Sequence, residues 1–478
     1  HVVAIMFENR SFDHLLGHLV TQSSKYDGCS PAISTCTNPL DPTDADSPQI
    51  PVGFDAVYVQ PGDPGHSISS TSHQLYGPNA SNNGEAYPAL MNGFVADYSR
   101  VDQIKGDQGK FIMQCFNQSS LPILSTLATE FATFNSWYAD VPGPTEPNRI
   151  YSWMTTSQGL GDDDAARLAE GFTGPSVFKM FDDYWNYTNI PSTDKWRTYW
   201  QTFPTSAFVE WVRLHPENGH FMDDFFSDVE KGDLPLFSWL DPNYSQMPGF
   251  PAADQHPDHD VTEGEKLLKR IYQALRNSTL WNDTLLLVFY DEHGGFYDHV
   301  SPSYAPNPDG INATKYGGPF DFSRLGLRVP AVLISPWIPK GYVVEHPAQN
   351  DYHNASQYSH SSLVHTLREQ YTPDCPAFSK RDSWSLTFEH VVMQLDEPRT
   401  DCPMTLPNVP KSNVFVANDD SPNADSFQNG LFHSVATLCD MTQDRLQEIL
   451  SAGSEVYGPA LMQCVQQWQS GDALYHKK

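Results

Sequence analysis

Basic side chains are scarce in this sequence. It has 28 lysine and arginine residues against 58 aspartate and glutamate residues, which gives a formal net charge of -30 at pH 7. Long-range repulsion from such an acidic surface disfavours nucleic acid and anionic membranes as partners. It does not disfavour zwitterionic lipids, and its simplest role is solubility. We therefore expect no nucleic-acid partner.

Long apolar runs and paired cysteine motifs are also missing. No apolar run approaches the roughly 18 residues of a membrane-spanning helix, so we expect no such span. The seven cysteines include no Cys-x-x-Cys pair, which argues against a zinc ribbon. The sequence opens directly in a strand-like run without a charged and then apolar leader, and we expect that a signal peptide has been removed.

Cysteines and glycosylation sequons together favour a secreted glycoprotein with N-linked glycans. Eight sequons begin at Asn79, Asn117, Asn186, Asn243, Asn277, Asn282, Asn312 and Asn354. A ninth, at Asn9, lies in a polar motif described below, and we interpret it as accidental. We expect disulfides between Cys29 and Cys36 and between Cys439 and Cys464, although sequence alone does not determine the pairing. The odd number of cysteines leaves at least one thiol unpaired.

The stretch that organises the chain begins with residues 284–290 (TLLLVFY), a short and continuous apolar run. This pattern is typical of a strand buried on both faces, as in a parallel sheet. The run ends at Asp291, Glu292 and His293, followed by two glycines. Ligands of open α/β sheets bind beyond the carboxyl ends of the strands. Two adjacent carboxylates repel each other unless a proton or a cation lies between them, so this end is a candidate metal site. The competing interpretation is a polar loop that caps the strand.

A second buried-strand pattern opens the sequence at residues 1–7 (HVVAIMF) and ends at Glu8 and Asn9. A carboxylate and an amide carbonyl suit a hard metal ion. The alternative is that these residues only precede a short helix at residues 11–16. Because Glu8 and Asn9 repeat the arrangement at Asp291, we interpret both strand ends as parts of one site.

Thr145 lies in a proline-rich loop, residues 141–149 (VPGPTEPNR). Three prolines in seven residues stiffen the loop around this hydroxyl. We predict a helix that starts after Pro147 and directs its N-terminal amides at an anion near Thr145. The alternative is an ordinary threonine in a turn.

Several histidines follow strand ends or precede helices. His66 follows a Pro-Gly turn, and taken alone it is an ordinary surface residue. His256 and His259 precede a helix that we predict from a capping box of Thr262 and Glu265. We favour phosphate contact or general acid catalysis over metal ligation for this pair, because no matching Cys or His pair is near in sequence. His360 near the start of a later helix could also face the site.

Strands and helices alternate along most of the chain, which predicts an α/β fold with a mostly parallel sheet. Further strands are expected at residues 133–138, 236–240 and 329–335, and a helix at residues 121–131. We expect one catalytic domain over residues 1–390 and a mainly helical C-terminal unit over residues 391–478. Residues 152–235 are rich in aromatic side chains, and we interpret them as a helical insertion that shapes the cleft.

A hydroxyl, hard oxygen ligands and histidines together suit displacement at phosphorus. A metal ion neutralises phosphoryl oxygens and lowers the pKa of a bound hydroxyl. A threonine alkoxide can then attack phosphorus, a histidine can protonate the leaving alkoxide, and water can hydrolyse the phospho-threonine. Oxygen ligation favours calcium, magnesium or manganese, whereas the neighbouring histidines leave zinc or iron open.

Five motifs carry a resemblance to the phosphoesterase family, which includes bacterial phosphatidylcholine-type phospholipases C, plant non-specific phospholipases C and an acid phosphatase. They are residues 8–17 (ENRSFDHLLG), 63–67 (DPGHS), 144–149 (PTEPNR), 256–260 (HPDHD) and 290–300 (YDEHGGFYDHV). Shorter matches occur at residues 328–331, 335–337, 380–384 and 399–403, so the resemblance extends to about residue 405. The chain is most similar to the plant-type phospholipases C.

The resemblance implies an alkaline-phosphatase-like α/β/α sandwich. It implies one divalent metal ion bound by Glu8, Asn9, Thr145, Asp291 and Glu292. It also implies Thr145 as the nucleophile, with Asn148, His66, His256 and His360 around the phosphate. To these phosphate contacts we add His259 and His293, and we take His256 and His360 as the catalytic histidines.

Three functions compete at this point. We favour a secreted, metal-dependent phospholipase C that contacts membrane surfaces transiently and releases diacylglycerol and a phosphorylated head group. An acid phosphatase of broad range could use the same site, because a monoester needs only a smaller pocket. A non-catalytic lipid- or glycan-binding protein would have no need of a nucleophile beside paired carboxylates.

Overall fold

The structure is a computed structural model that describes residues 1–83, 88–185, 190–245, 251–345, 355–412, 463–467 and 469. Its centre is an eight-stranded sheet with the order β11-β4-β10-β9-β1-β8-β6-β7. These strands are β1 (Val2–Phe7), β4 (Ala132–Phe134), β6 (Trp196–Trp200), β7 (Gly219–Phe221), β8 (Phe237–Asp241), β9 (Leu285–Tyr290), β10 (Ala331–Ile334) and β11 (Tyr342–Val344). Two small sheets pair β2 (Thr37–Pro39) with β3 (Gln49–Pro51) and β5 (Trp137–Tyr138) with β12 (Tyr358–Ser359).

Strand β1 lies between β9 and β8 and runs parallel to both. All six of its residues are buried, as its continuous apolar sequence predicts. Strand β10 is antiparallel to its neighbours β9 and β4. The remaining pairs of this sheet are parallel, so the predicted α/β class with a mostly parallel sheet is confirmed.

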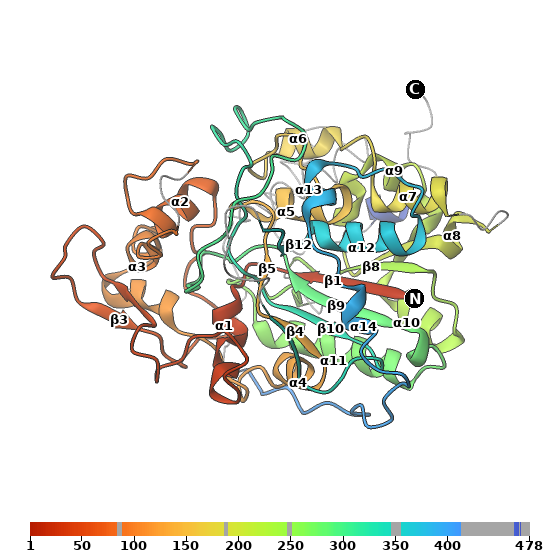
Figure 1. Ribbon diagram of the computed structural model, residues 1–478, viewed down its shortest axis with the longest axis horizontal. Helices are drawn as coiled ribbons and strands as arrows, with labels where there is room; N and C mark the ends of the chain where they lie inside the picture. Colours follow the sequence, from red (N-terminus) through yellow and green to blue (C-terminus); the bar gives the residue numbers. More distant parts are fainter. Residues whose placement is uncertain are drawn as a thin grey trace.

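Helices cover both faces of this sheet, which gives three layers (Figure 1). Helices α4 and α11 pack together on one face, with α10 beside α11, and α5 and α12 pack together on the other face with α7. The helices of the described segments are α1 (Phe12–Leu16), α2 (Ile68–Tyr76), α3 (Phe94–Tyr98), α4 (Pro122–Glu130), α5 (Thr145–Met154), α6 (Ala165–Glu170), α7 (Val177–Tyr184), α8 (Ser192–Lys195), α9 (Glu210–Arg213), α10 (Met222–Lys231), α11 (Val261–Asn277), α12 (Ser361–Tyr371), α13 (Lys380–Trp384) and α14 (Glu389–Val392), together with short 3₁₀ turns.

Beyond the carboxyl ends of β1 and β9 lies a second lobe that contains α2, α3 and β3 (Figure 1, left). It has its own buried apolar cluster, which includes Leu75, Phe94 and Tyr98. The predicted disulfide between Cys29 and Cys36 is confirmed there. The other predicted disulfide involves Cys439, which lies outside the described residues.

Three predictions of local structure need correction. Residues 133–138 form two short strands in different sheets, β4 and β5, instead of one. Residues 152–235 are not only helical, because they supply β6 and β7 to the central sheet. Helix α5 begins at Thr145 itself and not after Pro147. The division into two domains stays a prediction, since most of the chain beyond residue 412 lies outside the described part.

The predicted capping box at the start of α11 is also wrong. Asp260 is the N-cap, and its side chain accepts a hydrogen bond from the amide of Thr262. Glu265 is buried and instead accepts hydrogen bonds from the amides of Ile123 and Leu124, at 2.7 and 2.9 Å. Glu265 therefore caps the N-terminus of α4. The bonded residues are 142 and 141 positions apart in the sequence, so local spacing cannot reveal the contact.

Two consecutive glycines let the loop after β9 pass close to other motifs. Gly294 and Gly295 both have positive φ angles, of 63° and 72°. A Cβ atom on Gly294 would lie 2.0 Å from the carbonyl oxygen of Asn9, and one on Gly295 would lie 2.7 Å from that of Gly65. The glycines therefore allow three distant motifs to meet at one point.

Candidate active site

The carboxyl ends of β1 and β9 bring four of the predicted ligands together. The amide of Asn9 donates to Asp291 Oδ1 at 2.9 Å, and the amide of Arg10 donates to the carbonyl of Glu292 at 3.0 Å. Glu8, Asn9, Asp291 and Glu292 are all fully buried. Parallel neighbouring strands that end together explain this clustering.

Thr145 reaches the same point from the opening of α5. Its hydroxyl donates to Asn9 Oδ1 at 3.3 Å, and the residue is 1% exposed. Because Thr145 is the first residue of a ten-residue helix, it lies where unpaired amides favour negative charge. The hydroxyl is thus adjacent to the oxygen cluster and to a partly positive helix end.

Arg149 lies between two of the carboxylates. Its Nη2 is 3.2 Å from both Glu8 Oε1 and Asp291 Oδ2, and all three side chains are inaccessible to solvent. Its Nη1 donates to the hydroxyl of Tyr244 at 2.8 Å, and this hydroxyl donates to Asp241. A planar guanidinium that contacts two carboxylates at once fixes their separation.

The oxygen cluster retains unmet bonding capacity. Glu8 Oε2 and Glu292 Oε1 are buried and have no hydrogen-bond partner within the described residues. Burial and then the charge of Asp254 raise the pKa of Glu8, and burial, with a further contribution from Asp291, raises the pKa of Glu292 to about 8. A hard divalent cation stabilises neighbouring carboxylate oxygens that otherwise repel one another and lack hydrogen-bond partners. This set of donor atoms therefore fits such an ion.

Asn148 supports the loop that carries Thr145. Its Oδ1 accepts a hydrogen bond from the amide of Val141, and its Nδ2 lies 3.0–3.2 Å from the carbonyls of Val141, Gly143 and Pro144. The amide group is therefore engaged with the backbone of residues 141–144. These contacts shape the nucleophile's loop, and the phosphate contact of Asn148 stays a prediction.

His66 and His256 share one acidic neighbour. Asp63 Oδ1 is 3.7 Å from His66 Nδ1 and 3.8 Å from His256 Nε2. Burial disfavours the charged form of His66, but Asp63 and Glu292 outweigh it and raise the pKa of His66 to about 9. On its other side, the His256 ring contacts Asp258 through Nδ1. A histidine that a carboxylate orients through Nδ1 presents its other nitrogen in a fixed direction.

His259 belongs to the same group but faces Asp254. Its Nδ1 is 2.8 Å from Asp254 Oδ1. Burial opposes its charge, yet Asp254 and Asp258 raise the pKa of His259 to about 9. Ligand atoms of His256, Asp258 and His259 lie within 4.8 Å of one another, but the described contacts pair the rings with carboxylates. This pattern fits ion pairing, and phosphate contact or general acid catalysis by the two histidines stays a prediction.

The remaining two histidines are engaged inside the protein. His360 Nε2 donates to the carbonyl of Asp291 at 2.6 Å, and its Nδ1 accepts from Trp137 Nε1. Burial lowers the pKa of His360 to about 4. His293 Nε2 bonds to Gln74, and burial lowers the pKa of His293 to about 3. Catalysis by His360 and phosphate contact by His293 stay predictions, and in this structure the ring nitrogens named above already have partners inside the protein.

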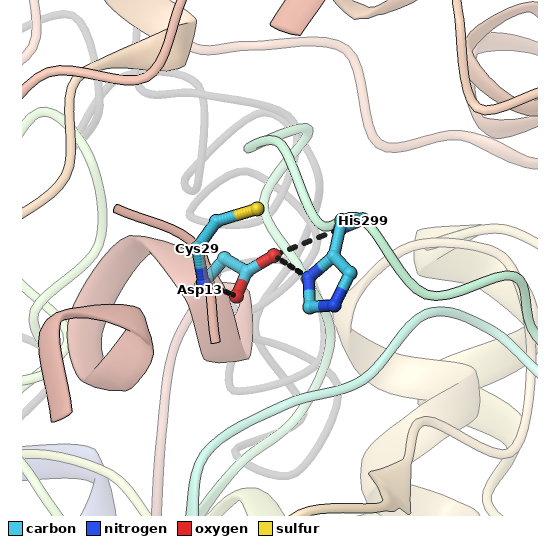
Figure 2. A group of neighbouring side chains, drawn as sticks. All are labelled: Asp13, Cys29 and His299. Atoms are coloured by element: carbon cyan, nitrogen blue, oxygen red, sulfur yellow. Dashed lines mark hydrogen bonds and ion pairs between the residues drawn. The ribbon is translucent and has the colours of Figure 1, made fainter. Parts of the chain in front are cut away.

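A second cluster with metal-ligand residue types lies beside the site, at Asp13, Cys29 and His299 (Figure 2). The sulfur of Cys29 is bonded to Cys36 and is not a thiolate. Asp13 is paired with His299 at 2.6 Å and with Arg328 at 3.4 Å. The group is therefore a buried ion-pair network and not a metal site.

Sequence analysis did not assign roles to Arg149, Asp258 or Asp254. Each lies within or next to a recognised motif, but a motif does not say which of its charged residues point inward. The helix that begins at Thr145 places Arg149, four residues later, on the same face, but the helix predicted to start after Pro147 did not include Thr145.

These features define a phosphoric ester hydrolase with an α/β fold, and comparison with known proteins gives the same class. Residues 1–372 match the model of the phosphoesterase family. The chain belongs to the phosphoesterase family.

Several curated relatives are phospholipases by name. "Non-specific phospholipase C6" of Arabidopsis thaliana is 38% identical over 91% of this chain and 80% of its own length. "Non-specific phospholipase C3" of the same plant is 37% identical over 91% of this chain and 82% of its own. "Phospholipase C A" of Mycobacterium tuberculosis is 26% identical over 70% of this chain and 68% of its own.

Solved structures resemble the chain only distantly. A protein of the alkaline phosphatase superfamily from Vibrio parahaemolyticus has 12% sequence identity and a TM-score of 0.30, over 53% of this chain and 60% of its own. No helix in the described ranges is long and apolar enough to cross a membrane.

Proposed function

We propose that this protein is a metal-dependent phospholipase C that hydrolyses the glycerol–phosphate bond of glycerophospholipids. The observation that carries the proposal is the contact between Thr145 Oγ1 and Asn9 Oδ1, at the edge of a buried oxygen cluster in which Glu8 Oε2 and Glu292 Oε1 have no hydrogen-bond partner among the described residues. The names of the relatives, several of which are phospholipases C, support the choice of substrate class.

In this proposal the Thr145 hydroxyl loses its proton to solvent, and Oγ1 attacks phosphorus and forms a new P–O bond. The bond from phosphorus to the glycerol oxygen breaks, and that oxygen takes a proton from His256 and leaves as diacylglycerol. The head-group phosphate remains on Thr145 as a diester until water, deprotonated by the same histidine, attacks phosphorus; the bond from phosphorus to Oγ1 then breaks, and Oγ1 takes up a proton from solvent. Asp258 and Asp63 hold the His256 ring in place throughout.

Glu8, Asn9, Thr145, Asp291 and Glu292 would hold the divalent ion, whose bound form lowers the pKa of a hydroxyl and neutralises phosphoryl oxygens. Arg149 keeps Glu8 and Asp291 at a fixed separation. The proposal names the bound ion only as one of calcium, magnesium, manganese, zinc and iron.

We further propose that the enzyme acts outside the cell on lipid surfaces and carries N-linked glycans. The disulfide between Cys29 and Cys36 supports an oxidising compartment. Sequons at Asn79, Asn277, Asn282 and Asn312 are exposed and accessible to modification. Asn243 is 1% exposed, and its amide donates to Pro251, so we exclude this sequon from the glycosylated set.

The direct test is to incubate the protein with long-chain phosphatidylcholine and a divalent cation and to analyse both products. Diacylglycerol together with phosphocholine is the expected result. Phosphatidic acid with free choline would show cleavage of the other phosphodiester bond. Efficient hydrolysis of a simple phosphomonoester without any lipid turnover would make the protein a phosphatase instead.

A further inference from the structure

A cavity of about 400 Å³ opens beside the nucleophile's loop. Its lining includes Pro144, which directly precedes Thr145, and His66. The lining also includes Asp63 and a run of three carboxylates, Asp162, Asp163 and Asp164, which precedes α6. The volume lies within the usual range for small-molecule sites.

The described residues pair none of the three carboxylates, Asp162, Asp163 and Asp164, with a lysine or an arginine. Their hydrogen bonds are with backbone amides: Asp163 accepts from Glu146 and Asp164 accepts from Arg167, both at 2.8 Å. Asp162 Oδ1 is buried without a hydrogen-bond partner in the same described part. Adjacent carboxylates repel one another, and a cation in the cavity would relieve this repulsion.

His66 provides an independent sign of a ligand. It is 8% exposed, lines the cavity, and uses Nδ1 for the carbonyl of Pro64 at 2.8 Å. Within the described residues its Nε2 has no hydrogen-bond partner. Because Nδ1 is held by the Pro64 carbonyl and the ring lies 3.7 Å from Asp63 Oδ1, Nε2 is the ring nitrogen left for a polar ligand such as a phosphate group.

The cavity beside Pro144 therefore combines a histidine nitrogen with four carboxylates and contains no lysine or arginine in its lining. A molecule that carries a phosphate and, a few atoms away, a positive nitrogen matches this combination of side chains. A neutral polyol head group would leave the three carboxylates without a counter-charge.

We propose that Asp162, Asp163 and Asp164 form a subsite for the ammonium group of a zwitterionic phospholipid head group, such as choline or ethanolamine. This inference rests on the proposed phospholipase C function, because it places the head-group phosphate at Thr145. It assigns head-group preference to residues other than the proposed metal ligands and the nucleophile.

The test compares binding of phosphocholine with binding of inorganic phosphate by isothermal titration calorimetry, in the presence of a divalent cation. The variant carries D162N, D163N and D164N, because asparagine retains the oxygens that accept from Glu146 and Arg167. A matched control carries D44N, D55N and D102N, which remove the same charge at exposed positions outside the cavity. We expect phosphocholine affinity to fall about tenfold or more, the loss typical of one charge-assisted contact, while phosphate affinity stays within about twofold in both variants.

Equal losses for phosphocholine and phosphate, or no loss for either, would overturn the subsite. A loss of calcium binding without a selective loss of phosphocholine would also overturn it, because the carboxylates would then be a metal site. If the triple variant does not fold, D162N alone is compared with the wild-type protein in the same titrations. In addition, choline chloride should weaken phosphocholine binding to the wild-type protein more than sodium chloride does. Selective phosphocholine binding by a protein that hydrolyses no lipid would refute the proposed function and leave the subsite standing.

Discussion

Nη2 of Arg149 lies 3.2 Å from Oδ2 of Asp291, in a position that water does not reach. The same nitrogen contacts Glu8 at an equal distance, so the guanidinium links the ends of β1 and β9. The positive charge of Arg149 thus balances part of the negative charge of the oxygen cluster, and in the proposed function a divalent ion would balance the rest.

Replacement of Arg149 by methionine should destabilise the protein by about 3–5 kcal/mol, because it leaves buried carboxylates without a partner. A saturating divalent cation should recover part of this loss, since it binds only the folded state. Urea unfolding with and without the cation measures both effects. As a control, R270M removes an exposed arginine that pairs with Asp223 and should change stability by less than about 1 kcal/mol. If a divalent cation does not reduce the loss of stability in R149M, the link between Arg149 and the metal site is contradicted.

Metal binding should release protons below about pH 8. Burial and Asp291 raise the pKa of Glu292 to about 8, so the side chain is protonated at neutral pH until an ion displaces the proton. Affinity should therefore increase as pH rises towards 8 and then level off. Calorimetry in buffers with different ionisation enthalpies measures the number of protons released. The E292Q variant should bind more weakly and release fewer protons; an unchanged proton count would contradict the role of Glu292.

Asp258 should act as a positioning residue for His256. Asparagine at this position keeps the shape but removes the charge that orients the ring, and we expect kcat to fall about 10–100-fold with little change in KM. Steady-state kinetics and their pH profile distinguish this from a structural defect, because the profile should shift together with kcat. D63N provides a comparison on the other side of the ring. An unchanged kcat in D258N would contradict the proposed role of His256 in proton transfer.

The stability of the folded state should decrease between about pH 6.5 and 9. The pKa of His259 is raised from 6.5 to about 9 by Asp254 and Asp258, although burial opposes it. The stabilisation is fully present below pH 6.5 and disappears as pH rises through 9, with a maximum of about 3 kcal/mol. Chemical unfolding at pH 6, 7.5 and 9 should show this slope in the wild type and a smaller slope in H259Q. Identical slopes would mean that His259 is not charged in the folded protein.

Much of the central sheet could be predicted from continuous apolar runs, because a strand buried on both faces has apolar residues at successive positions. Strands β1 and β9 appear close to the expected positions, with the polar residues directly after them. The inclusion of β6 and β7 in the same sheet could not be predicted, since their aromatic residues suit a helix or a strand equally well.

The roles of single side chains were harder to predict than the position of the site. Glu265 matches a local capping box, but it caps α4 instead. Asn148 and His360 occur in the right motifs, yet their polar atoms are engaged with the backbone around Thr145 and Asp291. Such contacts depend on long-range packing, which a single sequence does not reveal. The role of each predicted ligand stays a prediction until it is measured.

The central claim is that Thr145 carries the head-group phosphate during turnover, and rapid acid quench followed by mass spectrometry tests it most directly. With phosphatidylcholine as substrate, the peptide that contains Thr145 should carry phosphocholine in the wild-type protein, and the T145A variant should bind metal but show neither adduct nor turnover. An unmodified peptide throughout turnover, together with wild-type rates in T145A, would contradict the account.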